Sequence, residues 1–335
     1  MSSLHPVSGT VGEIVGQLSE WLAADDPAPL LIETSGSTGQ PKRVALSRSA
    51  VLASAQATHD RLGGPGRWTL VLPPSYVAGL QVIVRALLAG TPPSPALVAS
   101  DERSYVSLVP TQLHRLLASA ESAALLASYD AVLVGGASFA PALRSAAEGA
   151  GVHVVATYGM SETCGGCVYD GRPLDGVTVK IGADGLVRLT GPMLFDGYAD
   201  DPAQTASVMQ GGWFVTSDLG EIDHDGRLRV LGRGDDVVNT GGVKVPAAVV
   251  ARRLLAHPSV SAAEVVGVAD DEWGQRLVAI VVTHDQQSLS LDQTREWVAL
   301  EHPREWAPRE VVVVAEIPLL DNGKVDRLSL EGLVG

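Results

Sequence analysis

The chain has 335 residues, of which 46% are apolar, and a formal net charge of −14. This length predicts roughly two domains, and the apolar share is enough to bury a large core. A protein this acidic is a poor general binder of nucleic acid or anionic membrane, so we expect neither as a partner. The longest apolar run, Val77–Gly90, is interrupted by Arg85 and is too short to insert across a bilayer.

The two cysteines and the N-terminus bear on the compartment. Cys164 and Cys167 cannot form a disulfide framework, which favours a reducing environment. Met1–Leu30 has neither the basic start nor the continuous apolar run of a signal peptide. We therefore expect a cytoplasmic protein.

Strand-like and helix-like segments alternate from Pro29 to about Gly159. The strand-like runs are Leu30–Glu33, Trp68–Leu72, Tyr105–Val109, Ala131–Gly135 and Val152–Thr157. The helix-like stretches between them are Arg48–Leu62, Ala78–Leu88, Thr111–Ala120 and Ala140–Gly149, and an amphipathic helix, Val11–Ala24, is expected before this region. This alternation predicts a layered α/β domain with much parallel sheet.

The pattern changes after Val168. Turn signals at 183–185 and 223–226 predict β-hairpins up to Val230. Beyond Gly232–Asp236, a separate unit is expected to contain strands Ala263–Val268, Leu277–Thr283 and Glu310–Val314 and helices Ala247–Ala256 and Asp292–Leu300. We predict an N-terminal domain of residues 1–232 and a C-terminal domain of residues 233–335.

The strongest local motif is Thr34–Lys42, which follows an apolar strand. Its candidate phosphate-binding residues are Thr34, Ser35, Gly36, Ser37, Thr38, Gly39 and Lys42. Glycines allow close backbone approach, amides and hydroxyls can wrap a polyphosphate, and the lysine adds a positive charge. The glycine spacing is not that of a Walker loop. A Ser/Gly-rich surface loop is the alternative that composition allows.

Thr34–Lys42 resembles the phosphate loop of the adenylate-forming superfamily, which contains acyl-CoA synthetases, luciferases and peptide-synthetase adenylation domains. Further segments resemble motifs of that family in the same order: Gly135–Ala137, Tyr158–Thr163, Trp213–Gly220, Gly232–Asp236 and Asp321–Arg327. The resemblance covers roughly residues 30–330. It implies a large layered α/β N-terminal domain with a β-rich segment, and a small mobile α+β C-terminal domain.

The resemblance also implies the nucleotide-binding residues. Beyond the phosphate loop, they are Gly135, Gly136 and Ala137 at the adenine, Tyr158 and Gly159 in the central motif, Asp218 at the ribose hydroxyls, and Arg233 at ribose or phosphate. Seen alone, Asp218 could equally cap a turn, and Arg233 could form an ion pair between domains.

Three residues are the predicted catalytic set. Glu162 is a hard oxygen ligand suited to a Mg²⁺ ion shared with the ATP phosphates. Thr163 is expected to donate a hydrogen bond to the α-phosphate. Lys324, on an Asn-Gly-Lys turn, is expected to stabilise negative charge at the reacting α-phosphate and carboxylate. Without the resemblance, Glu162 and Lys324 would be ordinary exposed surface residues.

The family implies a reaction in two steps that uses ATP, Mg²⁺ and CoA. A substrate carboxylate first attacks the α-phosphorus, giving an acyl-adenylate and pyrophosphate. The small domain then turns about Asp235, so that Lys324 leaves and the face formed by Gly241, Gly242 and Lys244 arrives. The CoA thiol attacks the acyl carbonyl, and AMP departs.

The abbreviated chain, together with Ser107–Leu113 and Gly165–Gly171, most resembles the short actinobacterial o-succinylbenzoate–CoA ligases of menaquinone synthesis. This resemblance implies an aromatic dicarboxylic acid as the substrate. The implied acid pocket lies near Tyr76, Val77, Gly79, Thr111, Gly135, Gly159 and Cys164.

The sequence departs from the family pattern at three places. Arg43 replaces the usual glycine after Pro-Lys, and Tyr76 replaces a frequent histidine. The segment after Lys244, Pro246–Val250, is one residue short of the usual pattern. The first two departures bear on acid specificity and turnover, and the third bears on the thiol step.

Several alternatives stay open. The chain could be a ligase for another aryl or acyl acid, an adenylation enzyme that loads a carrier protein, or a homologue that binds nucleotide without turnover. Cys164 and Cys167 have C-x-x-C spacing, but a zinc site would need two more ligands, so we interpret them as small residues lining the acid pocket. A homodimer also stays open.

Overall fold

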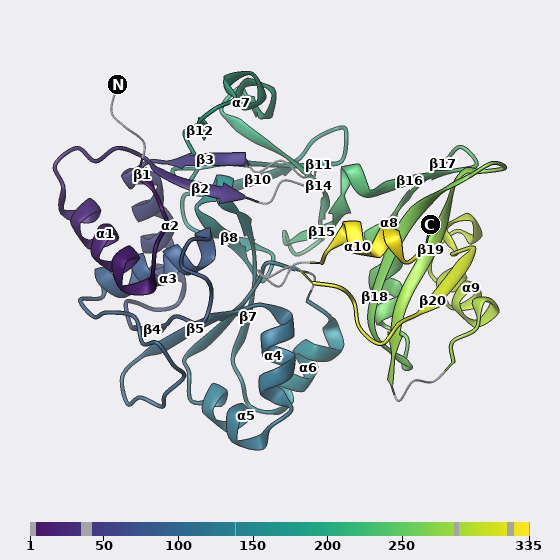
Figure 1. The fold of residues 1–335 in the computed structure, drawn as a ribbon, viewed down its shortest axis with the longest axis horizontal. Helices are drawn as coiled ribbons and strands as arrows, with labels where there is room; N and C mark the ends of the chain where they lie inside the picture. The colour runs from purple at the N-terminus through teal and green to yellow at the C-terminus, as the bar shows by residue number, and fades with distance from the viewer. Residues whose placement is uncertain (1–4, 35–41, 138, 285–287, 320–324, 335) are drawn as a thin grey trace.

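The structure is a computed structural model that describes residues 5–34, 42–137, 139–284, 288–319 and 325–334. An N-terminal α/β part lies beside a smaller C-terminal part, with strands β14 and β15 between them (Figure 1). No helix among these described residues is long and apolar enough to cross a membrane.

The central sheet has six strands in the order β4-β5-β6-β7-β8-β9. Their bounds are Arg67–Thr69, Ser104–Leu108, Ala131–Val134, Val154–Met160, Gly165–Tyr169 and Arg172–Pro173. Strands β4 to β7 pair in parallel, whereas β8 and β9 continue the sheet in antiparallel pairing. The parallel α/β sheet predicted from the alternating pattern is confirmed.

Helices cover both faces of this sheet. They are α1 (Val11–Ala23), α2 (Arg48–Arg61), α3 (Val77–Leu88), α4 (Pro110–Leu117), α5 (Ala120–Ala127) and α6 (Pro141–Gly149). Alternate residues of β6 point to opposite faces. Ala131 and Leu133 pack in the apolar cluster with α1, α2 and α3, whereas Val132 and Val134 pack with α4, α5 and α6. Strand β6 is therefore buried on both faces, and its sequence is continuously apolar.

The first predicted strand belongs to a different sheet. Strands β1 (His5–Pro6), β2 (Leu30–Thr34), β3 (Lys42–Leu46) and β12 (Gly197–Tyr198) form a four-stranded sheet in this order. Strand β2 pairs antiparallel with β3, and β3 pairs antiparallel with β12. This sheet brings the end of the proposed phosphate loop next to residues more than 150 positions later in the chain.

The predicted hairpin region forms a third sheet. Its strands are β10 (Thr178–Ile181), β11 (Leu186–Thr190), β13 (Met209–Gln210), β14 (Trp213–Ile222) and β15 (Leu228–Arg233). All of its pairings are antiparallel. A short helix that the sequence did not predict, α7 (Pro202–Val208), is capped by Asp201, whose carboxylate accepts a hydrogen bond from the amide of Gln204.

The C-terminal part has its own sheet and core. Strands β16 (Val237–Thr240), β17 (Val243–Pro246), β18 (Val260–Asp270), β19 (Gly274–Thr283) and β20 (Glu310–Val313) pack with helices α8 (Ala247–Leu255), α9 (Leu291–Ala299) and α10 (Arg327–Gly332). The chain passes from the hairpin sheet to this sheet through a short 3-10 turn, Gly234–Asp236.

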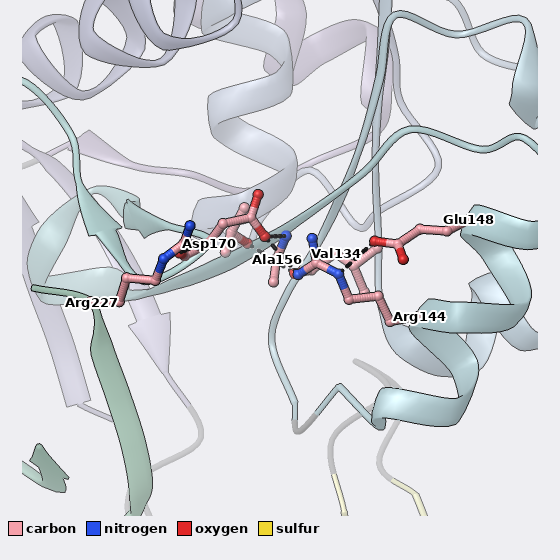
Figure 2. A network of polar contacts seen from close by, with 7 residues as sticks. Val134, Arg144, Glu148, Ala156, Asp170 and Arg227 are labelled. Atoms are coloured by element: carbon pink, nitrogen blue, oxygen red, sulfur yellow. Dashed lines mark hydrogen bonds and ion pairs between the residues drawn. The ribbon is translucent and has the colours of Figure 1, made fainter. Parts of the chain in front are cut away.

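One polar network anchors strand β7 at its start (Figure 2). Asp170, in the β8–β9 turn, accepts hydrogen bonds from Arg144 at 2.8 Å and from the amide of Ala156 at 3.1 Å. Its backbone carbonyl accepts from Arg227 at 3.1 Å, and Arg144 also pairs with Glu148. The network ties the start of β7 to α6 and to the β14–β15 hairpin.

Candidate active site

Two glycines form the turn that follows β6. A Cβ atom at Gly135 would lie 2.3 Å from Oγ1 of Thr157, so the turn passes too close to β7 for a side chain. Gly136 has a φ of 81°, which favours glycine. Ala137 follows and is exposed. The proposed adenine-binding turn therefore lies at the carboxyl end of the parallel strands, where such sheets bind ligands.

Tyr158, Asp218 and Arg233 come together beside this turn. The phenol of Tyr158, on β7, donates a hydrogen bond of 2.7 Å to Oδ2 of Asp218, on β14. Asp218 lies directly opposite Arg233 in the β14–β15 pairing. Burial, followed by the charge of Asp218, raises the pKa of Tyr158, so the phenol stays a donor. Tyr158 and Asp218, from two different sheets, thus form one hydrogen-bonded pair, and Arg233 lies next to Asp218 on the neighbouring strand.

The end of β7 is pressed against β8. A Cβ atom at Gly159 would lie 2.0 Å from the carbonyl oxygen of Gly165, so any other residue would force the two strands apart. The chain then forms a 3-10 turn, η1 (Ser161–Thr163), that carries Glu162. Gly159 is therefore required by close strand packing.

The structure corrects the role assigned to Thr163. Its side chain is buried, and its hydroxyl donates a hydrogen bond of 2.7 Å to the carbonyl oxygen of Gly165. The same hydroxyl accepts from the amide of Met160 at 2.9 Å. Because its only O–H is used inside the turn, Thr163 is not placed to donate to an α-phosphate. Ser161, in the same turn, is only half-buried.

Glu162 has a partner that sequence reasoning missed. The phenol of Tyr198, on β12, donates a hydrogen bond of 2.8 Å to Oε1 of Glu162. The ammonium of Lys42 lies over the same ring, 5.2 Å from its centroid. No spacing in the sequence connects Tyr198 to Glu162, because the contact depends on the pairing of β12 with β3.

The departure at Arg43 has a structural explanation. Its guanidinium donates to both carboxylate oxygens of Asp200, at 3.2 Å and 3.0 Å. Both side chains are well exposed. Arg43 is therefore engaged at the outer edge of the sheet.

Four of the seven proposed acid-pocket residues lie at the starts of helices α3 and α4. Tyr76 precedes α3 and is 36% exposed, and Val77 begins that helix. Gly79 packs so closely on Pro73 that an added Cβ would lie 2.2 Å from its carbonyl oxygen. Thr111 is half-buried in the first turn of α4.

Cys164, the last of the proposed pocket residues, has a fully buried thiol. Its backbone adopts a φ of 50°, and its carbonyl accepts a hydrogen bond from Ser54 at 3.0 Å. Burial raises the pKa of the Cys164 thiol, as it does for Cys167. The structure thus places the thiol of Cys164 within the core, below the start of β8.

The residues proposed for the thiol step lie elsewhere. Gly241 and Gly242, with φ values of 57° and 81°, form the tight turn between β16 and β17, and Lys244 is exposed on β17. This hairpin lies on the outer side of the C-terminal part, away from β7 (Figure 1). Asp235 lies in the turn that joins the two parts of the chain.

Some predicted residues cannot be placed. Ser35, Gly36, Ser37, Thr38, Gly39 and Lys324 lie outside the described residues. Of the phosphate-loop residues, Thr34 and Lys42 are described, and they face each other as the last pair of the β2–β3 ladder. The two ends of the loop therefore lie side by side.

A cleft of about 530 Å³ lies at the opposite end of the central sheet. Its lining includes Asp130 and His153, which precede β6 and β7, and the arginines Arg61, Arg172 and Arg227. The proposed nucleotide-binding residues lie at the other ends of these strands, so the cleft is separate from the proposed nucleotide site.

Glu162 is suited to be one ligand of a metal ion whose other ligands come from ATP. Among the described residues, no group of three or more His, Cys, Asp or Glu side chains could hold a metal ion by itself. Glu162 offers one hard carboxylate, and Mg²⁺ commonly binds one or two protein carboxylates together with substrate phosphates. The donor set therefore suits Mg²⁺ shared with ATP.

Comparisons with known proteins match both parts of the chain. A family model described as AMP-binding enzyme matches residues 6–198, and a model described as AMP-binding enzyme C-terminal domain matches residues 249–324. A probable 2-succinylbenzoate–CoA ligase of Mycobacterium tuberculosis is 42% identical over 335 residues, covering 95% of this chain and 87% of the relative. The 2-succinylbenzoate–CoA ligase of Escherichia coli is 35% identical, covering 89% of this chain and 67% of the relative.

Solved structures give the same picture. The o-succinylbenzoate CoA synthetase of Bacillus subtilis in complex with the acyl-adenylate intermediate OSB-AMP has a TM-score of 0.76 and 26% identity, covering 90% of this chain and 68% of that one. The same enzyme in complex with ATP and a magnesium ion has a TM-score of 0.75 and 26% identity, covering 90% and 69%.

Proposed function

This chain belongs to the family of AMP-binding enzymes, and on that premise we propose that it is an ATP-dependent o-succinylbenzoate–CoA ligase of menaquinone biosynthesis. One observation carries the proposal. The adenine turn, Tyr158, Asp218 and Glu162 gather at the carboxyl ends of β6 and β7, although they come from separate segments. The choice of o-succinylbenzoate as the acid rests on the names of the relatives.

The first step joins the acid to AMP. The carboxylate of o-succinylbenzoate attacks the α-phosphorus of ATP, a new C–O–P linkage forms, and pyrophosphate leaves. In this scheme, Asp218 accepts from a ribose hydroxyl, and the half-buried hydroxyl of Ser161 donates to the α-phosphate. Lys42 adds positive charge where the loop re-enters the sheet. Positioning and neutralised charge supply most of the rate enhancement in displacements at phosphorus.

Mg²⁺ would neutralise the phosphate oxygens during this step. Glu162 is the carboxylate proposed to hold it, in company with the phosphates of ATP. Lys324 is proposed to stabilise the charge that develops between the carboxylate and the α-phosphate.

The second step transfers the acyl group to sulfur. The thiol of CoA attacks the acyl carbonyl, a C–S bond forms, and AMP leaves with the electrons of the broken C–O bond. We propose that the domain of residues 233–335 turns about Asp235 between the steps. The outer position of the Gly241–Gly242 hairpin in the structure supports a rotation of this kind, because the hairpin must travel to reach β7.

The cellular setting follows from the substrates. ATP and CoA are small molecules of the cytoplasm, and both cysteines are free thiols. We therefore propose a cytoplasmic enzyme.

Pyrophosphate release tests the proposed reaction. Wild-type protein should release pyrophosphate from ATP with o-succinylbenzoate, and with CoA added it should form the thioester. Lys324→Ala should lower the rate of pyrophosphate release by a factor of roughly 10²–10³, as when one charge-stabilising donor is removed from an active site. Binding of AMP by the variant, measured by calorimetry, should stay at the wild-type level and is the folding control.

Other outcomes would change the proposal in stated ways. Release with benzoate-like or fatty acids, but not with o-succinylbenzoate, would keep the ligase and discard the acid. No release with any acid, while AMP still binds, would replace the enzyme with a nucleotide-binding homologue that lacks turnover.

A further inference from the structure

Tyr198 connects two charged residues of the proposed ATP site through one aromatic ring. Its phenol donates to Oε1 of Glu162 at 2.8 Å, and its ring lies under the ammonium of Lys42 at 5.2 Å. Among the residues that the structure describes, Lys42 and Glu162 form no direct ion pair with each other. Both charged groups therefore contact the same tyrosine, one at its ring and the other at its hydroxyl.

Tyr198 is itself held in place from several sides. Its amide donates to Oγ1 of Thr205 at 2.8 Å, and its backbone pairs with Val44 on β3. The ring of Phe195 packs edge-on against it, with centroids 5.2 Å apart. Tyr198 is only 7% exposed. A donor that is held this firmly can impose a direction on a flexible side chain.

The backbone of Glu162 is bound to the same segment. Its carbonyl oxygen accepts a hydrogen bond from the amide of Phe195 at 2.9 Å. The side chain and the main chain of Glu162 thus both receive hydrogen bonds from residues 195–198. This double attachment leaves little rotational freedom to a glutamate, which has three rotatable side-chain bonds.

The phenol of Tyr198 offers one hydrogen, and Oε1 of Glu162 receives it. The other carboxylate oxygen is then left with a defined direction. Hydrogen-bond partners of metal-binding carboxylates orient them, and the loss of such a partner typically reduces metal affinity by about 10–100-fold.

We propose that Tyr198 is a positioning residue: its phenol holds the Glu162 carboxylate in the direction that receives the cation of Mg·ATP, and its ring seats the Lys42 ammonium beside the same phosphates. The inference rests on the proposed function, because Glu162 must hold Mg²⁺ for its orientation to matter. It adds a residue from β12 to a site otherwise built from β2–β3 and the end of β7.

Tyr198→Phe is the direct test, because it removes the hydroxyl and keeps the ring that contacts Lys42. Titration calorimetry should show Mg·ATP binding weakened by about 10-fold, and the Mg²⁺ concentration for half-maximal ATP binding should rise by a similar factor. Binding of AMP without Mg²⁺ should change by less than about 2-fold. Tyr158→Phe is the matched control, since its phenol serves Asp218 and its loss should weaken AMP binding.

A second variant guards against a failure to fold. Thr205→Val removes the acceptor for the Tyr198 amide without touching the phenol. It should raise the half-maximal Mg²⁺ concentration by a smaller factor, about 3-fold, with AMP binding unchanged. A smaller change is expected because β3 pairing still holds the Tyr198 backbone.

The outcomes separate this inference from the function beneath it. If Tyr198→Phe binds Mg·ATP as the wild type does, while Glu162→Gln loses it, Tyr198 is not a positioning residue and the proposed function stands. If Tyr198→Phe weakens AMP as much as Mg·ATP, its effect is structural and the inference is overturned. If Glu162→Gln leaves Mg·ATP binding and turnover intact, the proposed metal role of Glu162 falls, and the inference falls with it.

Discussion

The phenol of Tyr158 donates a hydrogen bond of 2.7 Å to Oδ2 of Asp218 and so joins the central sheet to the hairpin sheet. Asp218 also lies opposite Arg233 on the next strand. The carboxylate proposed to bind ribose therefore has one oxygen already directed by a tyrosine. The carboxylate of Glu162, which is proposed to bind Mg²⁺, likewise accepts a hydrogen bond from a tyrosine, Tyr198.

Tyr158→Phe should weaken AMP binding by about 10-fold. The lost bond has a charged acceptor, and such bonds contribute roughly 1.5–3 kcal/mol, of which solvent recovers a part. Calorimetry with AMP measures the change. Asp218→Asn and the double variant complete a double-mutant cycle. The loss of AMP-binding free energy in the double variant should be smaller than the sum of the two single losses, because the two residues act as one unit. Fully additive losses would show that the Tyr158–Asp218 hydrogen bond does not affect how Asp218 binds the ribose.

Arg43→Gly should leave turnover within about 2-fold of the wild type. Arg43 pairs with Asp200 at an exposed edge, and exposed pairs of this kind contribute at most about 1 kcal/mol. Steady-state pyrophosphate release and a urea unfolding curve measure the two effects. Asp200→Ala is the matched control and should behave similarly. A large loss of turnover in Arg43→Gly alone would indicate that the arginine acts on a substrate.

His59 should make the protein less stable as the pH falls from about 6.5 to about 4. The Trp68 indole donates to Nε2 of His59 at 3.2 Å, and burial, with the Arg85 charge second, lowers the pKa of this histidine to about 4. The unfolded chain, with a pKa near 6.5, takes up the proton first. The stabilising effect is therefore complete above pH 6.5 and is lost on acidification, by roughly 3 kcal/mol in all.

Urea unfolding at several pH values measures this loss. His59→Gln keeps an acceptor for the Trp68 indole but does not titrate, so it should show a shallower decline over the same pH range. An identical decline in both proteins would assign the pH dependence to other groups.

Cys164 and Cys167 should resist thiol reagents in the folded protein. Both side chains are fully buried, and burial raises the pKa of both thiols, whereas the reactive species is an accessible thiolate. A disulfide reagent such as DTNB should react slowly with native protein and rapidly with protein unfolded in guanidinium. Fast labelling of native protein would show that the core beneath β8 opens readily.

Much of the fold follows from local pattern alone. The apolar run at Ala131–Val134 cannot be satisfied by one buried face, so a strand between two helical layers was predictable from composition. The helix that the pattern placed at Thr111–Ala120 is α4, which already ends at Leu117, and the next helix, α5, which Ser119 caps, was not predicted. A capping serine inside a helical pattern is a weak signal when the neighbouring residues are good helix formers.

The motifs predict which segments carry the nucleotide chemistry, because several of them follow one another in the family's order along the chain, whereas Asp218 or Glu162 alone would not have indicated a site. Their partners were not determined in this way. Whether Thr163 or Ser161 presents its hydroxyl depends on the turn that η1 makes against β8, and the structure uses Thr163 inside that turn. Tyr198 reaches Glu162 only because β12 pairs with β3, a contact between residues more than 150 positions apart. Sequence patterns report the preferences of neighbours along the chain, whereas hydrogen bonds across sheets depend on strand register, which only the packed tertiary structure decides.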